Sequence, residues 1–172
     1  LMEHALLSPT AFNIQNWRFV RVTDRAQRKA IRAAAWDQAQ VEDASELLVL
    51  CFSNSAWEQD PARYWRNAPQ QVQDFLVPAI AQYYGGRPQA VRDEGMRSCG
   101  LVGQNLMLVA QELGYDSCPM DGFDYARVGE IIGLPADHDI AFMVVIGKGV
   151  KEAWPRPGQL PLEEVLVENR FA

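Results

Sequence analysis

The chain has 172 residues, which is enough for one domain with a hydrophobic core. Its apolar content of 48% and charged content of 22% are ordinary for a globular protein. The formal net charge of −6 argues against a nucleic-acid partner, because phosphate backbones require a basic face. We expect neither a membrane span nor a signal peptide, since no apolar run is long enough.

The cysteines and histidines point to no structural crosslink or metal centre. Cys51, Cys99 and Cys118 are odd in number and scattered, and no Cys-x-x-Cys is present. Cys51 lies in an apolar run and is expected to be a small core residue. Two histidines, His4 and His138, are too few for a histidine-based metal site. These features favour a reducing, cytoplasmic setting.

The first third of the chain alternates short helical and strand patterns. Residues 1–7 have apolar positions at helical spacing, although no N-cap residue precedes them. Residues 17–22 predict a strand, and Thr23 is a suitable N-cap for a helix that continues to about Ala35. The continuous apolar run over residues 47–52 predicts a buried strand.

Residues 61–92 are rich in aromatic side chains at helical spacings. Pro69 and Pro78 are expected to break or kink a single helix, and Gly85-Gly86 ends the segment. Two interpretations stay open: a helical hairpin packed on the core, or a lid over a ligand site.

The clearest helix covers residues 97–113, whose apolar side chains occupy nearly its whole circumference. Such a helix is buried, and a dimer interface would bury it readily. Gly100 and Gly103 would allow another helix to approach closely, and Gly114 fits the left-handed position that ends the helix.

The last regular elements follow this helix. Asp124 can cap a helix that runs to about Ile132 and ends at Gly133, and residues 140–147 predict a buried strand. The sequence contains no Gly-x-Gly-x-x-Gly fingerprint, P-loop, nucleophile elbow or evident catalytic triad. A chain without an obvious acid, base or nucleophile often leaves the chemistry to a cofactor.

Two segments offer groups that could hold a planar heterocycle. The first is Ser8-Pro-Thr-Ala-Phe-Asn13-Ile-Gln15-Asn-Trp17, in which two carboxamides lie two residues apart in a loop. Carboxamides both donate and accept hydrogen bonds, so they suit a ring with alternating N–H and C=O edges. The alternative is an ordinary surface turn. The second is Gly114-Tyr-Asp-Ser-Cys-Pro119-Met-Asp121-Gly122-Phe123, whose Asp-Gly pair is also common in turns.

Both segments, in this order, resemble motifs of the nitroreductase family, and so does the tail over residues 156–165. Thr10 stands where the family has a second Ser, and Asn16 replaces the usual Pro. The resemblance covers nearly the whole chain. It implies a single α+β domain with a mostly antiparallel central sheet flanked by helices, a homodimer, and a variable lid at about residues 57–95.

The resemblance also implies FMN as cofactor and assigns the residues that hold it. The loop residues Ser8, Pro9, Thr10, Asn13 and Gln15 would contact the flavin from the opposite subunit. The turn residues Pro119, Met120, Asp121 and Gly122 would face the flavin N5 and O4 edge, with Asp121 beside N5. Weaker assignments are Gln38 and Gln40 at the ring and Arg156 at the phosphate, where a guanidinium grips oxyanions well. No catalytic side chain and no metal are expected.

One family element is not matched. Members carry an arginine- and serine-containing segment, farther before the loop than the seven residues that precede Ser8 here, which holds the flavin phosphate. We therefore expect residues 1–172 alone to hold FMN weakly.

The function expected from the resemblance is hydride transfer from NAD(P)H to a nitroaromatic, quinone or similar small acceptor by a ping-pong mechanism. The alternative is a non-catalytic flavin-binding or flavin-scavenging dimer. A third interpretation is a dimeric helical scaffold that binds no flavin. The expected partners are a second copy of the chain and a small acceptor, without nucleic acid or membrane.

Overall fold

The computed structural model describes residues 1–171, in which four strands form one antiparallel sheet. The strand order is β1-β2-β4-β3. The strands are β1 (Trp17–Arg21), β2 (Glu46–Ser53), β3 (Asp116–Met120) and β4 (His138–Gly147). The two central strands, β2 and β4, are apolar and almost wholly buried, as residues 47–52 and 140–147 predicted.

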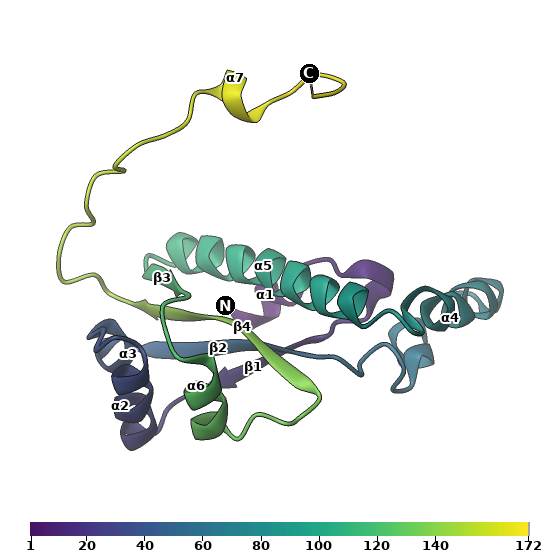
Figure 1. Ribbon diagram of the computed structural model, residues 1–172, viewed down its shortest axis with the longest axis horizontal. Helices are drawn as coiled ribbons and strands as arrows, with labels where there is room; N and C mark the ends of the chain where they lie inside the picture. The colour runs from purple at the N-terminus through teal and green to yellow at the C-terminus, as the bar shows by residue number, and fades with distance from the viewer. Residues whose placement is uncertain (172) are drawn as a thin grey trace.

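Helices cover both faces of the sheet, which makes the fold α+β as expected (Figure 1). One face carries α1 (Met2–Ala5) and α5 (Pro88–Glu112). The other carries α2 (Arg25–Ala34), α3 (Gln40–Asp43) and α6 (Tyr125–Ile132). Each face therefore has its own apolar cluster against the sheet.

The bounds of helix α5 and the surroundings of its glycines differ from the prediction. It begins at Pro88, nine residues before the predicted start at residue 97, and it ends at Glu112. An added Cβ at Gly103 would lie 2.3 Å from the Phe142 ring and 3.2 Å from Leu50. Gly103 thus allows the helix to approach the sheet rather than another helix. Gly100 meets nothing within 4 Å and lies on the exposed side.

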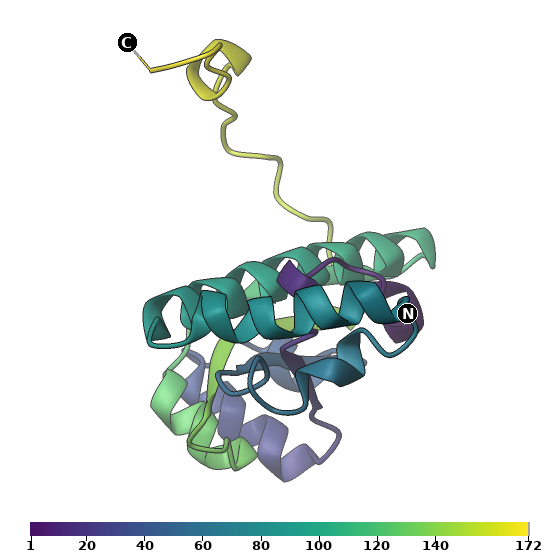
Figure 2. The ribbon, with the colours of Figure 1, turned by 90° about the vertical axis from the view of Figure 1, so that its right-hand side faces the viewer.

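The aromatic-rich region forms a short 3-10 turn, Pro61–Tyr64, and then α4 (Gln70–Tyr84). Helix α4 contacts the first part of α5 near the turn between them, which agrees with the helical hairpin, one of the two interpretations left open (Figure 2). Pro69 precedes α4, but Pro78 lies inside it and does not end it. The carbonyl that loses its partner belongs to exposed Asp74, where water can replace the missing N–H.

Two further expectations need correction. The N-cap of α2 is Asp24, not Thr23, because the Asp24 carboxylate accepts the Gln27 N–H at 2.7 Å. Strand β3 was not foreseen, since only Met120 among its residues is buried and Pro119 cannot donate to a ladder. The capping of α6 by Asp124 and its left-handed end at Gly133 are confirmed.

Residues 148–171 leave the sheet as an exposed arm that includes the short helix α7 (Leu162–Val165) (Figures 1 and 2). All of these residues are exposed, although many are apolar. Among residues 1–171, no helix has the length and apolarity that a bilayer crossing requires.

Candidate functional site

Backbone strain concentrates in two segments. Seven non-glycine residues of the described chain have positive φ, and five of them fall in residues 12–15 and 36–37. They are Phe12, Asn13, Gln15, Trp36 and Asp37, with φ between 40° and 56°. Such conformations cost free energy and persist where the surroundings enforce them, often at functional sites. We call these regions the loop site (residues 8–15) and the turn site (residues 36–40 and 119–122).

The loop site is held by its own hydroxyl groups. Ser8 donates to the Ala5 carbonyl at 2.8 Å, which joins the loop to α1. Thr10 accepts the backbone N–H of Gln15 at 3.0 Å and so closes the turn. The Ser and Thr positions of the motif therefore shape the loop.

The loop site is also attached to the aromatic region. The Asn13 amide donates to the Tyr64 carbonyl at 2.9 Å, and the Trp65 indole donates to the Phe12 carbonyl at 3.0 Å. Gln15 donates to the Asn13 side-chain oxygen at 3.3 Å. The strained loop and the region over residues 57–95 consequently form one connected surface.

The turn site joins two segments distant in sequence. The Gln38 amide donates to the Gly122 carbonyl at 3.0 Å, and Gln40 donates to the Gln38 oxygen at 3.2 Å. An added Cβ at Gly122 would lie 2.4 Å from the Trp36 ring. Glycine at this position therefore permits the contact with Trp36, in addition to keeping the backbone accessible.

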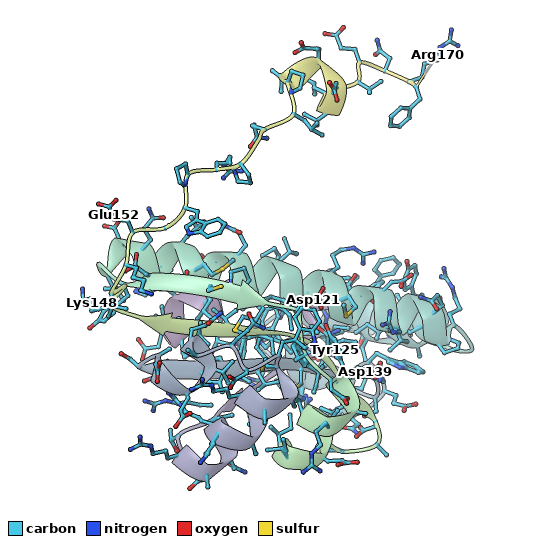
Figure 3. The ribbon with its side chains drawn as sticks, turned by 60° about the vertical axis from the view of Figure 1, so that its left-hand side comes forward. Asp121, Tyr125, Asp139, Lys148, Glu152 and Arg170 are labelled. Atoms are coloured by element: carbon cyan, nitrogen blue, oxygen red, sulfur yellow. The ribbon has the colours of Figure 1, made fainter. Side chains whose placement is uncertain are left out.

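Tyr125 fixes the carboxyl group of Asp121. Its hydroxyl hydrogen-bonds to Asp121 Oδ1, and it also lies 3.2 Å from the Ala141 carbonyl. The two side chains come together at the end of β3 and the start of α6 (Figure 3). Burial raises the pKa of Tyr125 to about 12, and the hydrogen bond and charge of Asp121 add to the shift. The phenol is therefore a neutral donor at neutral pH.

The turn leaves backbone donors available. Within residues 1–171, the backbone N–H groups of Asp121 and Gly122 have no protein acceptor. Pro119 and Met120 are the last residues of β3, paired with Val144 and Met143 of β4. This pairing holds the turn at the edge of the sheet, and the two N–H groups are free for a ligand.

The structure brings some predicted residues together and keeps others apart. Gln38, Gln40, Asp121 and Gly122 share the turn site, on the face of α2 and α6. The loop site packs instead with α4 and α5. Arg156 lies on the exposed arm, where it donates to Gln159 at 2.9 Å.

Three residues at these sites were not foreseen from the sequence. Trp36 and Tyr125 act through contacts with Gly122 and Asp121, and no motif marks them. Glu94, which is 5% exposed, accepts the Ala11 N–H of the loop. Glu94 lies among charged residues before the predicted apolar helix, so no sequence signal marks it as buried. Among the described residues, no group of three or more His, Cys, Asp or Glu side chains could hold a metal ion.

The chain thus combines an α+β fold with two strained segments that carry carboxamide side chains. The sequence profile of the Nitroreductase family matches residues 1–148. Protein DrgA of Synechocystis is 50% identical in an alignment of 171 positions, and the match covers 96% of this chain and 81% of DrgA. An oxygen-insensitive NADPH nitroreductase of Helicobacter pylori is 30% identical, with coverage of 89% and 76%.

Solved structures agree with these sequence matches. The protein ydfN of Bacillus subtilis, described as a nitroreductase, has a TM-score of 0.90 at 30% identity, covering 96% of this chain and 84% of its own. A protein of Exiguobacterium sibiricum, described as a nitroreductase in complex with FMN, has a TM-score of 0.88 at 30% identity, with coverage of 96% and 82%. The chain belongs to the Nitroreductase family, as the two motifs indicated.

Proposed function

We propose that the chain is an FMN-dependent oxidoreductase that uses NAD(P)H to reduce a nitroaromatic, quinone or similar small acceptor by a ping-pong mechanism. The observation that carries this proposal is the turn site, where the Gln38 carboxamide is hydrogen-bonded to a turn with free backbone donors and the Gln40 carboxamide to Gln38. Family membership, the nitroreductase relatives and the FMN complex of the Exiguobacterium protein support it.

The residues of the turn site fit an isoalloxazine ring. Such a ring needs N–H donors for its carbonyl oxygens and acceptors for its own N–H. The backbone N–H groups of Asp121 and Gly122 supply donors, and Gln40 supplies a carboxamide whose oxygen makes no hydrogen bond within residues 1–171. The loop residues Ser8, Pro9, Thr10, Asn13 and Gln15 would reach the ring from a second copy, and Arg156 would contribute to the phosphate.

When bound, FMN supplies a group that accepts and gives up hydride, so the protein needs no nucleophile. The chain's own residues bind and orient. Tyr125 holds the Asp121 carboxyl group in one place, and Gln38 holds the Gly122 carbonyl through a hydrogen bond. Because these groups are fixed before a ligand arrives, binding costs little reorganisation.

We propose that the protein is a homodimer in which the arm packs on the partner. The arm exposes Trp154, Leu162 and Phe171, whose exposed fractions are 94%, 67% and 86%. On α5, Leu101 and Leu108 are also exposed beside the open face of Gly100. Uncovered apolar surface of this extent marks an interaction site. Light scattering at micromolar concentration should give twice the chain mass; a monomer would contradict the dimer.

Residues 57–95 are proposed as a lid of the single domain 1–172. The segment joins the loop site through Tyr64 and Trp65, and Phe75 on α4 is 74% exposed. The acceptor would contact this segment, which gives a role to the exposed aromatic side chains of Phe75 and Tyr83 on α4. We further propose a cytoplasmic location, since the three cysteine thiols are free, as a reducing compartment requires.

The function is tested by spectroscopy followed by kinetics. The purified protein is titrated with FMN, and NAD(P)H oxidation is then followed with a nitroaromatic and with a quinone. We expect a flavin spectral change, acceptor-dependent turnover, and parallel double-reciprocal plots. Flavin binding without turnover would favour a flavin-scavenging dimer instead. A protein that produces no flavin spectral change would contradict both interpretations.

A further inference from the structure

A cavity of about 270 Å³ lies between the loop site and the lid. Its lining consists of two arginines, three carboxamide residues and one tyrosine: Asn13, Gln15, Arg63, Tyr64, Arg66 and Asn67. Asn13 and Gln15 belong to the strained loop, and the other four lie in or beside the 3-10 turn Pro61–Tyr64. The cavity is therefore part of the surface that the proposed flavin loop presents to its ligands.

The charge of this cavity is opposite to that of the protein. No carboxylate lines it, and within residues 1–171 neither Arg63 nor Arg66 forms an ion pair. The chain as a whole carries a formal net charge of −6. By contrast, the half-buried Arg32 is paired with Asp37 and Glu42. Two unpaired guanidinium groups beside carboxamides are a donor set for an oxyanion.

Arg63 is held in place before any ligand binds. Its guanidinium donates to the Tyr64 hydroxyl at 2.6 Å, and its central carbon lies 4.7 Å from the centre of the Tyr64 ring. The Tyr64 hydroxyl in turn donates to the Ala56 carbonyl at 3.1 Å. The Tyr64 carbonyl accepts from Asn13, which connects the arginine to the loop. A guanidinium fixed in this way loses little conformational entropy when it binds a phosphate.

We propose that this cavity binds a phosphate group of the nicotinamide dinucleotide reductant. The inference rests on the proposed function, because it assigns a reactant of that reaction to the cavity. The volume is slightly below that of pockets for drug-sized ligands, so it suits a phosphate with part of a ribose rather than a whole dinucleotide. The phosphate of FMN carries the same chemistry, and the experiment must separate the two sources.

The test uses Arg63→Gln and Arg66→Gln in the FMN-loaded protein. Arg66 is exposed, so its substitution should not affect folding. Arg21→Gln is the matched control, because it removes the same charge at a surface pair with Glu46, outside the loop and turn sites. Calorimetry measures binding of ADP-ribose, which carries the dinucleotide's two bridging phosphates without nicotinamide. Kinetics compare NADPH with reduced nicotinamide riboside, which has no phosphate, using a neutral quinone as acceptor.

We expect each cavity variant to weaken ADP-ribose binding about tenfold or more, since a charge-assisted hydrogen bond is lost. The KM for NADPH should rise, while kcat, the constants for the riboside and the FMN affinity stay unchanged. The inference is wrong if Arg21→Gln has the same effect, if the riboside is affected equally, or if the variants lose FMN instead. A wild-type protein that does not oxidise NAD(P)H refutes the proposed function itself. If wild type oxidises NAD(P)H and the cavity variants keep the wild-type ADP-ribose affinity and KM for NADPH, only the phosphate subsite is refuted.

Discussion

The buried carboxylate of Glu94 accepts a hydrogen bond from the backbone N–H of Ala11 at 3.0 Å, across 83 positions of the chain. The same oxygen accepts from Ser98 at 3.1 Å, and the other oxygen pairs with Arg97. Glu94 is 5% exposed, so helix α5 supplies a buried negative group to this part of the loop. The position of the loop site is thereby coupled to the packing of α5 on the sheet.

Glu94→Ala should therefore destabilise the fold and loosen the loop. The Ala11 N–H and the Ser98 hydroxyl lose their acceptor in a buried setting, which costs roughly 1.5–3 kcal/mol. Glu94→Gln keeps one acceptor oxygen, so the stability of this variant should lie between those of wild type and Glu94→Ala. Urea unfolding measures the stability, and a flavin titration measures how far the looser loop lowers the flavin affinity. The control is Asp93→Ala on the exposed side of α5. Equal losses at positions 93 and 94 would contradict the coupling.

Gly122→Ala should weaken flavin binding with little effect on stability. The new methyl group would overlap the Trp36 ring, which is exposed and can move aside. Its displacement disturbs the turn site but leaves the core intact, so the change in unfolding free energy should stay below about 1 kcal/mol. Adding Trp36→Ala should restore much of the affinity. A double variant as impaired as Gly122→Ala would show that Trp36 is not the cause.

The turn itself is tested by comparing Asp121→Pro with Cys118→Ala. Proline removes a free backbone donor and the carboxyl group that Tyr125 holds. Cys118 lies on an exposed part of β3 and contributes little volume to the core. We expect a large loss of flavin binding and turnover in the first variant only. Both proteins must first be shown to be folded by circular dichroism; equal flavin affinities would then refute the role of the turn.

The three cysteines should differ in reactivity. Burial raises the pKa of Cys51 and of Cys99 to about 12, and neither side chain reaches solvent. Cys118 is exposed, although partial burial raises its pKa as well. Because the thiolate is the reactive form, iodoacetamide at pH 8 should modify Cys118 alone in the native protein. Mass spectrometry of native and denatured samples gives the number of modified cysteines in each. Labelling of Cys99 in the native state would indicate that α5 opens.

The elements that were predicted well have the simplest apolar patterns. Strands β2 and β4 are continuous apolar runs, because both of their faces are covered by helices. The first turns of α5 contain charged residues and the buried Glu94, so the apolar pattern there is interrupted and the start was placed too late. The sequence of β3 has almost no pattern of buried side chains. The strand is held in the sheet by its backbone pairing with β4 instead.

The segments of the candidate site could be predicted by motif, but the contacts between them could not. The motifs identified Asn13 and Asp121, whose residue types and spacing are visible in the chain. The contacts of Trp36 with Gly122 and of Glu94 with Ala11 join segments more than eighty positions apart. Such contacts depend on tertiary packing, which leaves no local pattern in either segment.

Tyr125 should make stability depend on alkaline pH. Its ordinary pKa is 10.0 and its pKa in the folded protein is about 12, first because of burial and then because of Asp121. Between these values the unfolded chain releases its proton before the folded chain does. The contribution of Tyr125 to stability is therefore fully present below pH 10 and is lost as the pH rises to 12. Since its side chain is partly exposed, the loss is smaller than full burial would give.

The loss is measured by chemical unfolding at pH 9 and pH 11. Wild type should lose more stability between the two than Tyr125→Phe, which has no phenol to ionise. Tyr84 also has a pKa of about 12, but it is present in both proteins and cancels in the comparison. Asp121→Asn removes the negative charge and leaves burial unchanged, so the pKa of Tyr125 should fall only part of the way towards 10. Absorbance titration of the phenolate resolves this shift, and a Tyr125 pKa that does not change in Asp121→Asn would show that the carboxyl group does not act on the phenol.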